Sequence, residues 1–537
     1  MSPRKGILQT LSVIGLLATQ VVLAPTAKAA PGDLDPSFGT GGKVTTDFSG
    51  FGGRAAAVAL QPDGKIIAGG RAGGANFYGT GFGVARYNAD GSLDSTFGIG
   101  GTVTIDFFFG DDEVHSVLAQ PDGKIVAAGS KIFQFPGDFE LVRFNADGSL
   151  DASFGVGGKV TTDISDIDSI NDAVLQPDGK IVVAGGTGSL GTGSLALARY
   201  NPDGTLDTTF GTGGIVVSGL PMIALTLALQ TDGRLVTAGA SGVSFGLARF
   251  NADGSVDTSF GAGGLVTTNF PEGFASANAV ALQSDGKIVA AGGGSVPFVL
   301  ARYNTDGSLD TSFGVGGKVT GTYDDFAIAN GAVVQPDSKI VAVGAAGAFT
   351  TTAHFALARY NTDGSLDATF GTGGRVTTDF GGQFDFAQAV ALQPDENIVV
   401  AGVAAIIGSP DQFALARYQG GGVVTVPINI KPESGTNPIP LSSMGRIPVA
   451  ILSTSSFDAT SVDPNSVCFG DAEAPAERDC TAAHSALEDV NTDGRLDLLL
   501  LFETGQTGID PGDTRACLTG TTFSAVGIEG CDSIKTL

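Results

Sequence analysis

Apolar residues in this chain fall in short runs that are separated by turns rich in glycine and aspartate. Between Leu265 and Tyr303 four such runs follow one another, at 265–270, 279–283, 287–292 and 298–303, with Asp285-Gly286 between the second and the third. Runs rich in β-branched residues predict β-strands, and Asp-Gly predicts a tight hairpin turn. Both alternate positions of each run are apolar, and one is often alanine or glycine, which indicates a sheet covered on both faces.

This order of strands and turns occurs seven times between Pro31 and Gln419. Each unit carries three phrases: L-D-x-x-F-G-x-G-G-x-V, then Q-P-D-G-K-I-V-x-A-G, then a strand that ends in arginine and an aromatic residue. The phenylalanines of the first phrase are Phe38, Phe97, Phe154, Phe210, Phe260, Phe313 and Phe370; the glutamines of the second are Gln61, Gln120, Gln176, Gln230, Gln283, Gln335 and Gln393; the arginines of the third are Arg86, Arg143, Arg199, Arg249, Arg302, Arg359 and Arg417. A four-stranded unit of this length predicts the blade of a β-propeller, for which about four to eight blades are usual. An open β-solenoid of paired sheets is the alternative architecture.

The predicted fold class is therefore all-β. We expect a seven-bladed β-propeller with four-stranded antiparallel blades over residues 30–419, followed by a small β-sandwich-like domain over residues 420–537. From Pro427 the repeat phrases end, prolines become frequent, and all four cysteines follow. The segment Gln419–Val426 is either a linker or a further strand that helps to close the ring.

The connections between strands differ in a systematic way at the two ends of the predicted sheets. The P-D-G turns and the N-x-D-G turns share one end and barely change, whereas the connections at the other end differ in every unit. Those variable connections carry acids, among them Asp111, Asp112, Glu113, Asp324 and Asp325. Variable loops on a rigid frame often carry binding sites, so we predict that this end is the contact surface; the alternative is that these loops vary because nothing constrains them.

The repeat phrases resemble a known family. Q-P-D-G-K-I, L-A-R-Y-N-x-D-G-S-L-D and F-G-x-G-G-K-V are similar to the delta-60 repeat of exported bacterial proteins, over about Pro31 to Gln419. The resemblance implies a secreted β-repeat architecture and little about chemistry. Asp337-Ser338 and Asp395-Glu396 depart from the pattern, because each replaces the Asp-Gly turn.

Residues 1–29 have the pattern of a signal peptide for export. Arg4 and Lys5 precede a mostly apolar stretch, and Ala27-Lys28-Ala29 fits the small-x-small cleavage rule. A membrane anchor is the alternative, although polar residues dilute the run. We expect a secreted, extracellular or cell-surface protein with no transmembrane segment in the mature chain. Removing the segment changes the formal net charge from −26 to −29, since it holds three basic residues and no acid, and such a surface repels nucleic acid and anionic lipid.

The four cysteines, Cys468, Cys480, Cys517 and Cys531, lie in the last seventy residues. In an exported chain this predicts two disulfides in a small terminal domain. Three pairings are possible, and we favour Cys468–Cys480 with Cys517–Cys531 because near neighbours lose the least entropy on closing. A reduced zinc site is the alternative, but the close C-x-x-C pairs typical of such sites are absent.

A candidate calcium site lies in "EDVNTDGRLDLLLLF", from Glu488 to Phe502. The predicted ligands are Asp489, Asn491, Asp493, the Arg495 carbonyl and Asp497, with Gly494 at the sharp bend. The loop resembles the calcium loops of EF-hands, dockerins and thrombospondin type repeats. It departs from the EF-hand because Leu500 stands where a bidentate glutamate is expected, so a further carboxylate would come from elsewhere, such as Asp510 or Asp513. The alternative is a hairpin loop rich in Asx turns.

Catalytic patterns are weak in this sequence. The three histidines, His115, His354 and His484, have no spacing typical of a catalytic triad or a metal site, so we expect them in loops or at the surface. We therefore predict a secreted, monomeric binding or adhesion protein that is not an enzyme, with calcium as its ion and an extracellular protein or glycan as its partner. The alternatives are an extracellular hydrolase or lyase acting on polysaccharide at the propeller face, and a structural cell-envelope protein. An acid or histidine cluster near the propeller axis would favour the enzyme.

Overall fold

The structure is a computed structural model of the 537-residue chain. It describes residues 30–537 except 49–51, 74–79, 108–110, 133–136, 189–193, 272, 296–297, 324–326, 348–351, 406–407, 422, 433, 435–436, 442–444, 455–456, 473–477 and 523–526. The predicted signal peptide, residues 1–29, lies outside the described residues. The described chain is built from strands, without an α-helix, and has short 3₁₀ turns at Ala459–Ser461, Pro464–Ser466 and Thr504–Gln506. No helix in this described part is long and apolar enough to cross a membrane.

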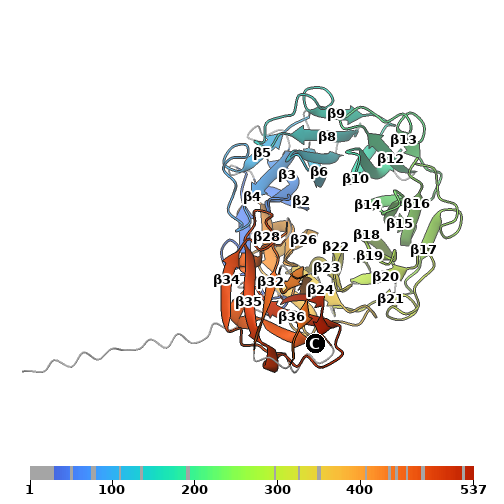
Figure 1. The fold of residues 1–537 in the computed structure, drawn as a ribbon. Helices are drawn as coiled ribbons and strands as arrows, with labels where there is room; N and C mark the ends of the chain where they lie inside the picture. Colours follow the sequence, from blue (N-terminus) through green and yellow to red (C-terminus); the bar gives the residue numbers. More distant parts are fainter. Residues whose placement is uncertain are drawn as a thin grey trace, which may run out of the picture.

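Seven four-stranded antiparallel sheets stand around one axis, which confirms the predicted seven-bladed propeller (Figure 1). The strands nearest the axis are β2 (Gly53–Leu60), β6 (Asp111–Ala119), β10 (Asp168–Leu175), β14 (Ile223–Leu229), β18 (Ala275–Leu282), β22 (Ala327–Val334) and β26 (Phe384–Leu392). The second strands are β3 (Ile66–Gly73), β7 (Ile125–Ile132), β11 (Ile181–Thr187), β15 (Leu235–Ser241), β19 (Ile288–Gly294), β23 (Ile340–Ala346) and β27 (Ile398–Ala405). The third strands are β4 (Thr80–Tyr87), β8 (Phe139–Phe144), β12 (Ser194–Tyr200), β16 (Ser244–Phe250), β20 (Val299–Tyr303), β24 (His354–Tyr360) and β28 (Gln412–Tyr418).

In the first six blades the outermost strand comes from the next repeat along the sequence, and in the seventh it is β1 (Lys43–Thr46), from the first repeat. The outer strands are β5 (Thr102–Ile105), β9 (Lys159–Thr162), β13 (Ile215–Val217), β17 (Leu265–Thr268), β21 (Lys318–Val319), β25 (Arg375–Thr378) and β1 (Lys43–Thr46). The prediction that one sequence unit makes one blade is therefore wrong. Each blade combines the last three strands of one unit with the first strand of another unit. The reason is that the N-x-D-G turn folds the following strand back against the strand that precedes it, as in the pairing of β17 with β16.

The ring is closed by its N-terminal strand. β1 pairs with β28, so the last blade has the order β1-β28-β27-β26. The segment Gln419–Val426 does not supply the closing strand. Gln419 exchanges backbone hydrogen bonds with Gly32 and Asp33, and β29 (Val423–Thr425) pairs in parallel with β37 (Gly527–Ser533) of the C-terminal part.

Seven apolar clusters hold neighbouring blades together, one at each contact between adjacent sheets. This explains why both faces of each strand are apolar, since every sheet packs against one blade on each side. Alanine and glycine at many of these positions let the sheets approach closely.

The recurring phrases build the same contact at every blade. In the first blade the Arg86 guanidinium forms a buried ion pair with Asp94 at 2.9 Å and lies over the Phe97 ring at 4.7 Å. Its Nη1 also donates to the carbonyl of Ala146 in the next repeat, so one arginine joins two blades. The equivalent ion pairs are Arg143–Asp151, Arg199–Asp207, Arg249–Asp257, Arg302–Asp310, Arg359–Asp367 and Arg417–Asp35. This packing explains why the same residues recur in every repeat.

The C-terminal part is a β-sandwich, as predicted. One sheet has the order β29-β37-β36-β33 and the other β30-β32-β35-β34, and a single apolar cluster lies between them. The remaining strands are β30 (Ile428–Ile430), β31 (Pro438–Ile439), β32 (Arg446–Ile451), β33 (Cys468–Asp471), β34 (His484–Glu488), β35 (Asp497–Glu503), β36 (Arg515–Thr521) and β38 (Lys535–Thr536). Both disulfides have the favoured pairing, Cys468–Cys480 and Cys517–Cys531.

Candidate functional site

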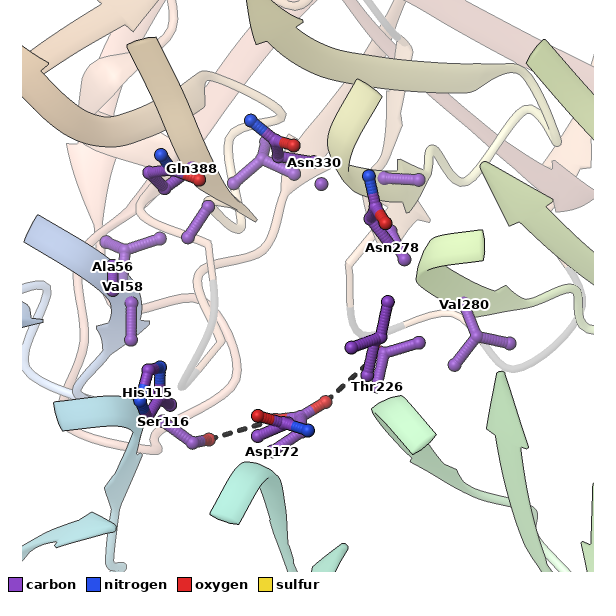
Figure 2. Close-up of a pocket in the computed structure, with 18 of the residues that line it drawn as sticks. Ala56, Val58, His115, Ser116, Asp172, Thr226, Asn278, Val280, Asn330 and Gln388 are labelled. Atoms are coloured by element: carbon purple, nitrogen blue, oxygen red, sulfur yellow. Dashed lines mark hydrogen bonds between the residues drawn. The ribbon is translucent and has the colours of Figure 1, made fainter. Parts of the chain in front are cut away.

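The propeller axis holds a cavity of about 310 Å³ that is lined by the seven inner strands (Figure 2). This volume is at the lower end of the range of ligand pockets, about 300–1,000 Å³. Each inner strand carries a β-bulge at the same place, and the bulged residue lies in the cavity lining. These residues are Ala56, His115, Asn171, Leu225, Asn278, Asn330 and Gln388. A bulge leaves one residue unpaired and turns its side chain out of the ladder, which is how a strand buried on both sides presents polar groups to the axis.

Three asparagines of this ring join neighbouring blades. Asn171 Nδ2 donates to the Ala224 carbonyl at 2.7 Å, and Asn278 Nδ2 donates to the Ala329 carbonyl at 2.9 Å. Asn330 Nδ2 donates to the Ala387 carbonyl at 2.9 Å. One donor of each amide nitrogen is therefore used for structure. Asn278 Oδ1 also accepts from Ser276 Oγ at 2.9 Å, so the oxygens of Asn171 and Asn330 are the acceptors that remain for a ligand.

Asp172 is the carboxylate in the described cavity lining, and it links three blades. Its Oδ1 accepts from Ser116 Oγ at 3.0 Å, and its Oδ2 accepts from Thr226 Oγ1 at 3.1 Å and from the Leu227 amide at 2.8 Å. Burial raises the pKa of Asp172, while these hydrogen bonds act in the opposite direction. Because both oxygens are already bonded to the protein, Asp172 positions Ser116 and Thr226 more readily than it binds a ligand.

His115 is the imidazole of the ring, and no hydrogen bond of the described chain occupies its nitrogens. Burial lowers the pKa of His115, which keeps the imidazole neutral at pH 7 and able to accept a proton. The expectation that the histidines lie in loops or at the surface is wrong for this residue, because it stands half-buried in β6 beside Ser116 (Figure 2). His354 begins β24, and His484 is exposed at the start of β34.

The acids of the variable connections are not all in loops. Asp111, Asp112 and Glu113 begin the inner strand β6, and the Asp112 side chain is fully buried, with Oδ2 accepting from the Phe107 amide at 3.1 Å. Asp324 and Asp325 lie outside the described residues. Asp112 is therefore not part of the predicted acidic contact surface. Its buried carboxylate instead bonds to the backbone of the connection that precedes β6.

The predicted calcium ligands lie in an exposed loop between β34 and β35. Asp489 accepts from the amides of Asp493 and Gly494, at 3.1 Å and 3.0 Å, and Gly494 makes the bend with a φ of 87°. Asp497 is fully buried, and its two oxygens accept from the Ser453 and Val490 amides. Asn491 Oδ1 accepts from the Asp493 amide. The Asp493 side chain forms an ion pair with Arg495, with Oδ2 3.5 Å from Nη1. The described loop acids do not converge within 4.8 Å of one another, and Asp510 with Asp513 close a separate turn.

A signal for the axial ring is present in the sequence but was missed. Each bulged residue stands five positions before the glutamine of a Q-P-D-G phrase, as His115 does before Gln120 and Asn171 before Gln176. The residue types at this position vary, and only the bulge shows that they face the axis.

The fold and its axial ring define a β-propeller repeat protein. Six segments match the family model described as "Domain of unknown function (DUF5122) beta-propeller", at residues 61–97, 120–154, 176–210, 230–260, 283–313 and 335–370. These matches support a β-propeller repeat family. The search of curated proteins gives no match.

Several solved structures are similar to this chain. The Chaetomium thermophilum protein Sqt1, bound to the N-terminus of a ribosomal protein, is 12% identical, covers 70% of this chain and 98% of its own, and has a TM-score of 0.40. An ulvan lyase bound to a saccharide is 11% identical, with 70% and 96% covered and a TM-score of 0.39. An α-L-arabinofuranosidase from Fusarium graminearum is 11% identical, with 70% and 97% covered and a TM-score of 0.36.

One prediction is corrected by these comparisons. The sequence led us to expect a protein that is not an enzyme, yet solved structures similar to this chain include a polysaccharide lyase, an arabinofuranosidase, an arabinanase and a gluconolactonase. A claim that the chain lacks enzymatic activity is therefore not supported. That expectation rested on the spacing of the histidines and acids in the sequence, which does not report which residues the ring brings together at the axis.

Proposed function

We propose that the protein is an extracellular, polysaccharide-active β-propeller that holds a saccharide in its axial cavity, with His115 as the residue that transfers a proton. The observation that carries this proposal is the ring of bulged residues, which places one neutral imidazole among amide oxygens and hydroxyls. Amide and hydroxyl groups suit the hydroxyls of a sugar. The terminal disulfides and the signal-like start of the chain support an extracellular location.

Proton abstraction by His115 fits this cavity better than hydrolysis by two carboxylates. Glycosidases usually hold two carboxyl groups across the scissile bond, whereas the described lining has Asp172 alone, with both oxygens bonded to the protein. His115 has a lowered pKa and is therefore in the base form at neutral pH.

Replacing His115 with asparagine is expected to leave the fold and saccharide binding intact and to reduce turnover about 10²- to 10⁴-fold. Asparagine already occupies the equivalent bulge in three blades, at Asn171, Asn278 and Asn330, so the substitution suits the ring. The assay compares release of reducing ends and of unsaturated products from neutral and uronate-containing polysaccharides, with binding measured by calorimetry. His484→Asn, at the surface of the sandwich, is the matched control. Unchanged turnover in His115→Asn, or no binding of any polysaccharide by the native chain, would refute the proposal.

The C-terminal loop is proposed as a calcium site in support of this function. What supports it is that the side-chain oxygens of Asp489, Asn491 and Asp493 all turn toward the loop backbone. Calcium at one hundred times its Kd is expected to stabilise the sandwich by about 2.7 kcal/mol. Scanning calorimetry with and without calcium tests this: Asp489→Asn should abolish the shift, and Glu488→Gln, an exposed neighbour, should keep it. If calcium does not change the unfolding temperature of the native chain, the loop is not a calcium site.

The assignment of the repeats to the delta-60 family also stays a prediction.

A further inference from the structure

We propose that His354, Asp379 and Asp385 bind one divalent metal ion, such as zinc, where the sixth and seventh blades meet. His354 is the first residue of β24, Asp379 directly follows β25, and Asp385 is the second residue of β26. One ligand atom from each residue lies within 4.8 Å of the others. This site is separate from the axial cavity and does not rest on the proposed function.

The backbone brings these three residues together. Ala353 and Phe384 form a parallel bridge between the two blades. The Asp385 amide donates to the Ala353 carbonyl at 2.7 Å, and the Ala353 amide donates to the Gln383 carbonyl at 2.9 Å. The residues before His354 and Asp385 are therefore locked side by side, so their side chains are held without support from an ion.

The spacing is too long for hydrogen bonds and suits a shared ion. His354 Nδ1 lies 3.7 Å from Asp379 Oδ1 and 3.7 Å from Asp385 Oδ2, whereas hydrogen bonds to nitrogen are about 2.7–3.2 Å long. Ligand atoms held about 2.1 Å from one zinc ion in a tetrahedral site are roughly 3.4 Å apart. An ion between the three atoms would need little movement of the side chains.

Two buried polar atoms of the group lack a hydrogen-bond partner. They are His354 Nδ1 and Asp385 Oδ1, and the Asp385 side chain is fully buried. Leaving a buried polar group unpaired is unfavourable, because the group loses its hydrogen bonds to water and gains none in the protein. A bound cation would give His354 Nδ1 a partner and place a positive charge beside the buried Asp385 carboxylate.

Backbone amides orient both carboxylates, as hydrogen bonds commonly do around metal ligands. Asp379 Oδ1 accepts from the Gly381 amide at 2.6 Å, and Asp385 Oδ2 accepts from the Phe380 amide at 2.8 Å. Asp379 is largely exposed, with 60% of its side chain accessible, so an ion and its water can enter from solvent. One imidazole with two carboxylates favours zinc and similar ions over calcium, which prefers oxygen ligands alone.

The same place between the second and third blades gives a natural comparison. Asp138, Asp163 and Asp168 gather there in the same way, without an imidazole. Asp168 is fully bonded, because its oxygens accept from the Ile164 and Ser165 amides and from Thr187 Oγ1. That cluster is satisfied by the protein and is not proposed as a site.

Titration of the full chain with zinc chloride, followed by calorimetry, tests the proposal. We expect one zinc ion per chain with micromolar or tighter affinity, and at least a tenfold loss in His354→Gln and in Asp379→Asn. Asp379 is exposed, so its variant should fold normally, which the thermal midpoint checks. Asp163→Asn, at the equivalent place, and His115→Asn should both bind as the native chain does. Absence of zinc binding, or equal binding by His354→Gln and the native chain, overturns the proposal.

Discussion

Replacing Glu396 with glycine is expected to stabilise the propeller by about 4 kcal/mol at pH 8 and by about 2 kcal/mol at pH 5. Glu396 occupies the turn between β26 and β27, where five other blades have glycine, and its φ of 64° lies in the left-handed region. Its side chain is 2% exposed, and neither carboxylate oxygen has a hydrogen-bond partner. The left-handed backbone accounts for about 1 kcal/mol of the gain at both pH values.

The remainder of the gain depends on pH because the carboxyl group titrates. Burial, and then the charge of Asp337, raises the pKa of Glu396 from 4.5 to about 7. Since the folded pKa is above the unfolded one, the stability contributed by the group is fully present below pH 4.5 and is lost as the pH rises to about 7. A shift of this size corresponds to about 3 kcal/mol above pH 7. The native chain should lose about 2 kcal/mol of this stability between pH 5 and pH 8, and Glu396→Gly should not.

Tyrosine fluorescence during denaturant unfolding gives the measurement. The chain has no tryptophan, and the last tyrosine is Tyr418, so this signal reports the propeller and not the sandwich. Ser338→Gly is the matched control, because Ser338 replaces the same glycine in the preceding blade with a φ of 65° and has no carboxyl group. It should gain about 1 kcal/mol at both pH values. If Glu396→Gly instead gains equally at pH 5 and pH 8, the carboxyl group does not titrate as described.

Replacing Asp35 with alanine is expected to destabilise the propeller by about 3–5 kcal/mol, because it leaves a buried arginine without its partner. Asp35 and Arg417 are 382 residues apart in the sequence and form an ion pair at 2.8 Å in the last blade. Arg417 also donates through Nη1 to the Ala89 carbonyl of the neighbouring repeat. The pair therefore fixes the N-terminal strand β1 to β28 and seals the ring.

A matched variant distinguishes the stability that comes from closing the ring from the stability that comes from one ion pair within a blade. Asp94→Ala breaks the equivalent pair with Arg86 inside one continuous stretch of chain. We expect the two variants to lose similar amounts of stability, measured by the same tyrosine signal, because the closed ring treats all seven pairs alike. A small effect of Asp35→Ala beside a large effect of Asp94→Ala would mean that the N-terminal strand does not close the ring in solution.

Most of the fold could be predicted because its signals are local. The Asp-Gly turns, the apolar strands and the recurrence of three phrases predict hairpins and repeats from residues that are near one another in the sequence. The pairing of Cys468 with Cys480 was favoured for the same reason, since short loops close with little loss of entropy. The assignment of each first strand to its own unit failed because the choice between two neighbouring sheets is not local.

The candidate sites could not be predicted in the same way. His115 and Asp172 are more than fifty residues apart in the sequence. They share a cavity only because His115 is the bulged residue of β6 and Asp172 directly follows the bulged residue of the neighbouring inner strand β10. His354, Asp379 and Asp385 meet because one parallel bridge joins two blades. Spacing along the chain gives no sign of either group.

The sequence by itself determined the strands, the turns, the sevenfold repeat and the arginine, aspartate and phenylalanine that recur in each unit, because these depend on backbone preference and on contacts within one or two repeats. Only the tertiary structure decided which strand closes the ring, which residues face the axis and which acids meet a histidine between blades. Those choices depend on packing seven sheets around a common axis, where residues from opposite ends of the chain become neighbours.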